Sequence, residues 1–189
     1  MAATVTPLGY ALMGLIRDEA RSGYALRKVF ETTPMGNYSS SPGSIYPALK
    51  ALERTCLVEA RDATSRGKGL YHLTAQGRAA FADWLRAPVE DLGEAMLRFA
   101  FLHDAETSVT LAFLDAFEAT ARQGVAGLEA FLDSEDGRAM PLQARLAVEH
   151  GRRGQMASVD WAVWARKQLE RQQLGMPTPE NTNNWKKGN

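Results

Sequence analysis

The stretch SSSPGSIYPALKALERTCLVEA, residues 39–60, carries the signals of a turn and of a helix at once. Two prolines five residues apart and a cluster of serines favour a loop. From Ile45 onward, however, apolar residues recur at helical spacing. In a helix that turns roughly 100° per residue, one arc about 100° wide contains Ile45, Ala48, Leu49 and Leu52. This is the usual width of a stripe that faces a core. The stretch therefore predicts an amphipathic helix that begins abruptly at small polar residues.

The start of this helix has two possible positions. Ser41 could cap it with Pro42 in the first helical position, where the missing N–H is not needed, but Pro47 would then lie inside the helix and remove a backbone bond. Alternatively, Ser44 is the cap and Pro47 lies in the first turn. We favour the second arrangement, or a kinked version of the first. In both, backbone N–H groups at the polar N-terminus form a site suited to an anion such as phosphate.

The segments around this helix predict a winged helix-turn-helix. Helical spacing indicates a first helix over 5–18 and a second from Gly23 to about Thr33, capped by Ser22, followed by a long turn. Alternating residues after the third helix and the run 70–73 suggest a β-hairpin with a glycine-bearing tip, and Thr74 can cap a fourth helix. In this fold the third helix enters the DNA major groove, and the hairpin lies against the neighbouring backbone or minor groove.

The remainder of the sequence predicts helices: about 90–102, a longer one over 105–136, and the longest over 137–174, interrupted or loosened at Gly151 and Gly154. The longest helix is too exposed to be buried by its own chain, so we expect one of its faces at a homodimer interface. The four residues expected there are Leu146, Ala157, Trp161 and Trp164. The two tryptophans could instead line a pocket for an aromatic or drug-like effector. Dimer packing is the simpler interpretation.

Composition predicts a soluble cytoplasmic protein, and the helical spacing and hairpin signals described above predict a fold that is mainly α with a small β-hairpin. Of its 189 residues, 45% are hydrophobic and 23% charged, and the single cysteine, Cys56, excludes an internal disulfide framework. We see neither a membrane-spanning stretch nor a targeting segment. Residues 1–87 hold 11 basic and 7 acidic residues, and residues 88–189 hold 11 and 15, a modest indication that the first part contacts nucleic acid.

These patterns predict three parts of the chain. Residues 1–87 form the winged helix-turn-helix DNA-binding domain. Residues 88–174 form a helical dimerisation and effector domain. Residues 175–189 have the composition of a flexible tail.

Several short motifs, taken in order, resemble the PadR family of bacterial transcriptional regulators: SGYAL (22–26), SPGSIYPALKALE (41–53), CLVEA (56–60) and LYHLTAQGRAAF (70–81). The resemblance covers about residues 5–86. It implies a winged-helix regulator whose C-terminal helices form a homodimer. Two features depart from the family: Cys56 stands where members usually have glycine in a left-handed conformation, and SRGKG at the wing tip lacks the proline that members often carry there.

Most expected DNA contacts lie on or beside the third helix: Ser41, Ser44, Tyr46, Lys50 and Arg54. Arg27 and Lys28 on the second helix could contact phosphates, and so could Arg66 and Lys68 at the wing tip. The alternative for each is an ordinary solvated side chain. We expect Tyr24 in the core rather than on phosphate, and Cys56 as a partly buried apolar residue rather than a redox sensor.

The sequence thus predicts a homodimeric repressor that binds double-stranded operator DNA at an inverted repeat and is released by a small-molecule effector. A winged-helix module for protein contact, without DNA, is the alternative. The sequence contains no metal-binding or phosphate-loop motif, so we expect no cofactor, no metal and no catalytic residue. Glu149 and His150 are adjacent on the longest helix and point about 100° apart, so they form no evident acid–base pair.

Overall fold

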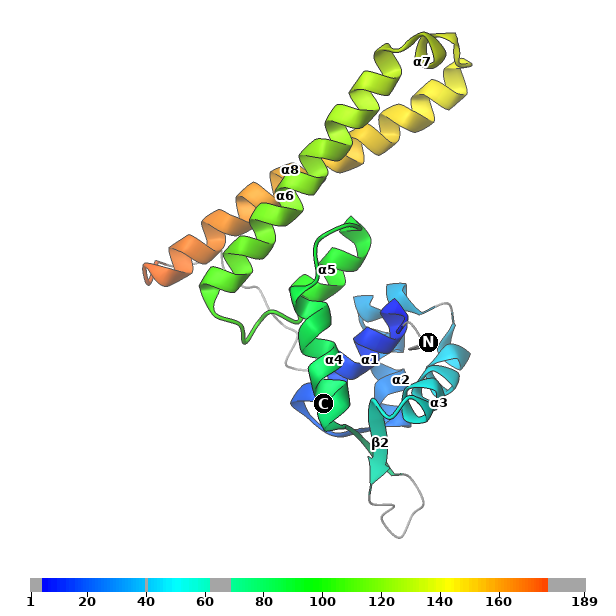
Figure 1. Ribbon diagram of the computed structural model, residues 1–189, viewed down its shortest axis with the longest axis vertical. Coiled ribbons are helices and arrows are strands. Elements are labelled where there is room, and N and C mark those ends of the chain that lie inside the picture. Colours follow the sequence, from blue (N-terminus) through cyan, green and yellow to red (C-terminus); the bar gives the residue numbers. More distant parts are fainter. Residues whose placement is uncertain (1–4, 40, 62–68, 177–189) are drawn as a thin grey trace. The chain divides into compact units, whose positions relative to one another are not determined.

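The computed structural model describes residues 5–39, 41–61 and 69–176 (Figure 1). The chain divides into two compact units, Met1–Ala87 and Pro88–Asn189. No helix in the described ranges is long and apolar enough to cross a membrane. The expected contacts Arg66 and Lys68 fall on the predicted wing tip, which lies outside the described residues.

The first unit is built on four helices: α1 (Pro7–Asp18), α2 (Gly23–Thr32), α3 (Ile45–Arg54) and α4 (Ala75–Arg86). Three begin at a hydroxyl side chain that accepts a hydrogen bond from a first-turn backbone N–H: Thr6 from Gly9, Ser22 from Ala25 and Thr74 from Gly77. The predicted caps Ser22 and Thr74 are confirmed. The helices enclose a core of fully or almost fully buried side chains that includes Leu12, Met13, Leu26, Ile45, Leu49 and Phe81.

A small antiparallel sheet completes this unit, with β1 (Arg21–Ser22), β2 (Val58–Arg61) and β3 (Leu70–Leu73) in the order β1-β3-β2. The hairpin strands were predicted, but the sequence analysis missed β1. Its two residues pair with Tyr71 and Leu70 of β3. A strand this short has no periodicity of its own and exists only because the distant β3 presents a free edge.

The long turn predicted before α3 is more regular than its composition indicated. It forms two 3-10 helices, Pro34–Tyr38 and Pro42–Ser44. Thr33 begins the first by accepting a hydrogen bond from the Met35 N–H at 3.2 Å. Proline and serine suit the tight turns of such short helices, which is why turn chemistry and helical geometry coincide here.

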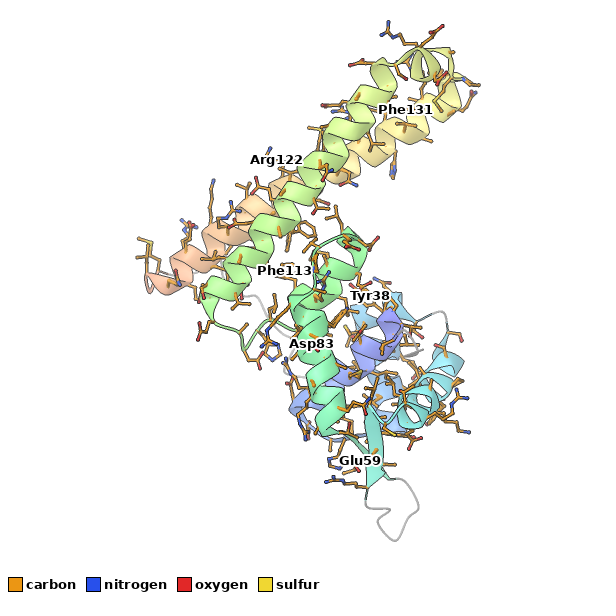
Figure 2. All side chains as sticks on the ribbon, in the orientation of Figure 1. Tyr38, Glu59, Asp83, Phe113, Arg122 and Phe131 are labelled. Atoms are coloured by element: carbon orange, nitrogen blue, oxygen red, sulfur yellow. The ribbon has the colours of Figure 1, made fainter. Side chains whose placement is uncertain are left out.

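The second unit consists of α5 (Leu92–Ala100), α6 (Thr107–Asp133), α7 (Glu135–Ala139) and α8 (Leu142–Gln173). The two long helices α6 and α8 pack along each other as a hairpin (Figure 1). Ion pairs join them at 3.0 Å, from Arg152 to Glu129 and from Arg166 to Glu118. Figure 2 shows Phe113, Arg122 and Phe131 spaced along α6.

Two predictions for this unit are wrong. The longest helix is continuous through Gly151 and Gly154, because its packing on α6 outweighs the cost of about 1 kcal/mol that glycine adds within a helix. The predicted helix over 105–136 ends at Asp133, where Ser134 starts α7 by accepting a hydrogen bond from the Gly137 N–H at 3.1 Å. A Cβ on Gly137 would lie 2.1 Å from the Phe131 carbonyl oxygen, so this turn requires glycine.

Candidate nucleic-acid interface

The third helix presents two opposite faces. Ile45 and Leu49 are completely buried beneath it. On the outer side Tyr46, Lys50 and Arg54 are exposed, and they border a shallow depression of about 550 Å³ together with Pro47 and Glu53. Lys50 and Arg54 form no ion pair with any other described residue, so both cations face solvent. The stripe predicted from the sequence is confirmed. Opposite it lies a cationic ridge, Lys50 and Arg54 with Tyr46, whose cations form no ion pair within the described ranges.

Tyr46 is held in place by the start of α2. A Cβ added to Gly23 would lie 2.7 Å from Cε1 of Tyr46, a distance that real side chains do not show. The ring therefore packs directly on the Gly23 backbone, while 43% of Tyr46 stays exposed. This contact explains why glycine precedes Tyr24 in the second helix. It fixes the position of an exposed aromatic residue on the ridge.

The serines before α3 bond to one another and to a carbonyl rather than capping the helix. Ser44 stands at the N-cap position, as favoured, and Pro47 lies in the first turn, but the Ser44 hydroxyl donates to the Ser41 carbonyl at 2.7 Å. Ser39 also donates to that carbonyl, at 2.8 Å, and lies 2.7 Å from Oγ of Ser44. The expected capping bond from the Ser44 side chain is therefore wrong. The serine cluster shapes the approach to the helix instead.

On the second helix, Lys28 is exposed, while Arg27 is already engaged. The Arg27 guanidinium forms an ion pair with Glu31 at 3.1 Å and lies 6.0 Å from the centre of the Tyr24 ring. Tyr24 is 54% exposed, so its predicted place in the core is wrong. An arginine with a carboxylate neighbour has less charge to offer a phosphate than Lys28 has.

The end of α3 is tied to the wing and to α4. Cys56 has a φ of 55°, the left-handed conformation that favours glycine, and it is exposed rather than partly buried as predicted. The Thr74 hydroxyl donates to the Cys56 carbonyl at 2.7 Å. A Cβ on Gly77 would lie 1.9 Å from the Leu57 carbonyl oxygen, so Gly77 allows α4 to approach the chain here.

Tyr71 brings the wing strand β3 close to α3. Burial raises the pKa of its hydroxyl above the ordinary value, and the nearby charges of Glu53 and Tyr46 raise that pKa further. The sequence analysis gave no role to Tyr71 or Glu53, because only folding brings strand and helix together. The flank of α3 that faces the wing thus carries a carboxylate beside the cationic ridge.

The four residues expected at a dimer interface separate into two groups. Leu146 and Trp164 are 58% and 54% exposed, and Ala157 is exposed on the same side of α8. Trp161 is half-buried in its own unit, with its ring edge-on to Phe99 at 5.1 Å and to Phe117 at 5.2 Å between centroids. Exposed apolar side chains therefore remain on one face of α8, where the exposed His150 and Arg153 separate Leu146 from Ala157.

Several charged residues of the helical unit pair with one another, Glu149 among them. Glu149 accepts hydrogen bonds from Arg152 and Arg153, and the Arg152 bonds are the main reason that its pKa is lowered to about 2. Within the described ranges no group of three His, Cys, Asp or Glu side chains could hold a metal ion. The carboxylate of Glu149 is thus engaged in hydrogen bonds with Arg152 and Arg153.

Comparison with known proteins places the first unit beside bacterial regulators. Residues 12–83 match the model of the transcriptional regulator PadR-like family. Transcriptional regulator YqjI of Escherichia coli (strain K12) is 42% identical over 71 residues, which make up 38% of this chain and 31% of that protein. The chain therefore spans about a third of the length of that relative.

Solved structures show a weaker likeness over a longer stretch. Bacillus subtilis PadR in complex with operator DNA is 22% identical, with 85% of this chain and 96% of that chain covered and a TM-score of 0.38. The PadR-like transcriptional regulator BC1756 from Bacillus cereus is 21% identical, with 87% and 99% covered and a TM-score of 0.40.

Proposed function

We propose that this chain is a DNA-binding transcriptional regulator of the PadR-like family, whose model residues 12–83 match. It acts as a repressor by occupying an inverted-repeat operator as a homodimer. The observation that carries the proposal is the cationic ridge of α3. Lys50 and Arg54 are exposed without ionic partners among the described residues, opposite a fully buried apolar stripe.

The ridge has the composition that a duplex groove accepts. Lys50 and Arg54 supply charge for phosphates and hydrogen-bond donors for guanine, while Tyr46 offers a fixed aromatic edge. Lys28 on α2 supplies a further phosphate contact, with Arg27 contributing less because of Glu31. Ser41 and Ser44 lie at the approach to α3, close to the phosphate path, and Arg66 and Lys68 on the wing are the proposed contacts beyond it.

The exposed apolar residues on one face of α8 support the homodimer. Large apolar side chains that stay exposed along one helix are typical of a surface that another subunit covers. In a symmetric pair, Leu146, Ala157 and Trp164 of each chain pack against the same residues of the other. Two recognition helices then address half-sites about 34–36 Å apart, one turn of DNA.

Release from DNA requires a ligand that prefers one arrangement of the two recognition helices. A small molecule bound in the helical unit shifts the equilibrium only by its difference in affinity between the DNA-bound and free arrangements. We place such an effector in the helical unit. The aromatic residues there, Trp161 with Phe99 and Phe117, suit a flat apolar compound.

The proposal is tested by selecting duplexes from a random library with the full-length protein at physiological salt, then measuring affinity for the enriched sequence and for a scrambled one. We expect an inverted repeat to be enriched and bound at least about 1,000-fold more tightly than the scrambled duplex. Selection of no sequence, together with recovery of a protein partner that covers α3, would instead establish a module for protein contact without DNA.

A further inference from the structure

A carboxylate without an ionic partner lies beside the cationic ridge of α3. Glu53 stands in the last turn of the helix, is half-buried, and borders the same depression as Tyr46, Lys50 and Arg54. Within the described ranges no ion pair or hydrogen bond engages its side chain. Lys50, three residues earlier, is at the spacing of a helical ion pair, yet none forms.

Four other carboxylates of the first unit are each neutralised by an arginine. The pairs are Asp18 with Arg17, Glu19 with Arg21, Glu31 with Arg27 and Glu59 with Arg61. Glu53 differs from these four, although an arginine follows it directly in the sequence, because adjacent side chains on a helix point about 100° apart. Its charge therefore remains available to a partner from outside the described chain.

Local forces count against a charged residue at this position. Glu53 lies at the C-terminal end of α3, where the helix carbonyl groups already concentrate negative charge. Partial burial removes water from the carboxylate, and no bond replaces that water. The charge of Glu53 contributes to the raised pKa of the Tyr71 hydroxyl, but no hydrogen bond joins the two side chains. A structural role for Glu53 would need a partner that the described residues do not supply.

Glu53 points in nearly the same direction as Tyr46. The seven residues between them turn a helix through about 700°, about 20° short of two full turns, and advance it about 10 Å. Lys50 lies between the two on the same side. A distance of about 10 Å corresponds to about three base pairs along a duplex, at about 3.4 Å per base pair. A groove that accepts the ridge therefore also meets the carboxylate of Glu53.

We propose that Glu53 is a specificity-determining residue, which reads a cytosine by accepting a hydrogen bond from its N4 amino group in the major groove. This inference rests on the proposed function. In the major groove guanine presents only acceptors, and thymine an acceptor and a methyl group. Adenine presents a donor beside the acceptor N7, which repels a carboxylate. Cytosine alone offers a donor without a neighbouring acceptor of its own, so a carboxylate without donors favours it.

Selection from a random duplex library with the wild type and two variants tests this assignment. In the wild type we expect cytosine at one position of each half-site, preferred over the other bases by about 5- to 100-fold. Glu53→Gln should favour adenine there, because an amide bonds to both N6 and N7 of adenine. Glu53→Ala should accept any base at that position and keep the wild-type sequence elsewhere.

Asp83→Asn is the matched control. Asp83 is an exposed carboxylate on α4, outside the ridge, and it forms no ion pair with another described residue (Figure 2). Its substitution removes the same charge from the same unit without touching α3. Asp83→Asn should therefore select the wild-type sequence, cytosine included.

A cytosine analogue tests the hydrogen bond itself. Pyrimidin-2-one, placed at the selected cytosine, lacks the N4 amino group. Fluorescence anisotropy should show that the wild type binds the analogue duplex about tenfold or more weakly, the effect of losing a hydrogen bond to a charged group. Glu53→Ala should bind the two duplexes equally. Because both proteins are measured on the same pair of duplexes, any change in the DNA alone affects them alike.

Three results would overturn the inference. Selection of one and the same sequence by the wild type and both Glu53 variants would show that Glu53 acts only as a charge that repels phosphates. Altered preferences at every position would show that it supports the shape of α3. Equal loss of affinity for the analogue duplex in the wild type and in Glu53→Ala would assign the cytosine contact to another residue. A wild type that selects no sequence contradicts the proposed function instead, so the two failures are distinct.

Discussion

The ring of Tyr46 covers Gly23 so closely that a Cβ on that glycine would lie 2.7 Å from Cε1 of Tyr46. The first residue of α2 thereby sets the position of an aromatic side chain on the outer ridge of α3. Sequence motifs from two helices, GY at 23–24 and IYP at 45–47, are thus two halves of one contact. The glycine is required by the tyrosine above it rather than by its own backbone conformation.

Gly23→Ala should displace the Tyr46 ring and weaken operator binding by about fivefold or more, as the loss of a well-positioned contact does. Stability should change little, because the helix propensity of alanine, up to about 1 kcal/mol, offsets the clash. Anisotropy and thermal unfolding measure the two effects. The double variant Gly23→Ala/Tyr46→Ala is the control. It should be more stable than Tyr46→Ala alone, and a less stable double variant would contradict the contact.

Cys56→Gly should stabilise the first unit. A non-glycine residue in the left-handed conformation costs about 1–2 kcal/mol, and the extra freedom of glycine in the unfolded chain returns about 0.4–1 kcal/mol of that. The free energy of unfolding should therefore rise by about 0.5–1 kcal/mol. Hydrogen exchange of the buried α1 and α3 amides measures this gain. Thr55→Gly, at a residue with φ −93°, is the matched control and should destabilise. A loss of protection in Cys56→Gly would show that the helix end does not carry this strain.

Trp164→Ala and Trp161→Ala should act on different properties. Trp164 is exposed, so its removal should shift the protein toward monomer in sedimentation velocity while the unfolding temperature of the monomer stays constant. Trp161 packs against Phe99 and Phe117, so its removal should cost about 3 kcal/mol of stability. A dimer unaffected by Trp164→Ala would contradict the proposed interface on α8.

The carboxyl group of Glu149 should titrate at about pH 2 rather than near its ordinary value of 4.5, chiefly because Arg152 donates hydrogen bonds to it. A carboxyl group whose pKa is lowered by folding stabilises the folded state at pH values above its ordinary pKa. That contribution should therefore be complete above about pH 4.5 and disappear as the pH falls toward 2. Carbon-detected NMR of labelled glutamate measures the midpoint. Arg152→Ala should raise it, and a midpoint near 4.5 in the wild type would show that the arginines do not hold Glu149.

The parts of the fold that depend on neighbours in sequence were predictable. The buried stripe of α3 follows from helical spacing, and Ser22 and Thr74 were recognised as caps because a cap bonds only three residues ahead. What depends on distant partners was not predictable. The strand β1 exists only beside β3, and Trp161 was distinguished from Trp164 only by the aromatic residues on α5 and α6. Tyr24 was expected in the core, yet at 54% exposure it lies over Arg27 at the surface.

The candidate site shows the same division. Tyr46, Lys50 and Arg54 could be placed on the exposed side from their positions relative to Ile45 and Leu49. The contact between Gly23 and Tyr46 and the interaction between Tyr71 and Glu53 join residues 18 or more positions apart, and no local pattern encodes them.

The salt dependence of operator binding is the most direct test of the cationic ridge of α3. The wild type is compared with Lys50→Ala, and Lys167→Ala, at an exposed position on α8, is the control. Loss of one phosphate contact should reduce the slope of log affinity against log salt by about one unit. We predict this reduction for Lys50→Ala alone, with an unchanged unfolding temperature. Identical slopes and affinities for all three proteins would contradict the assignment of α3 to the DNA interface.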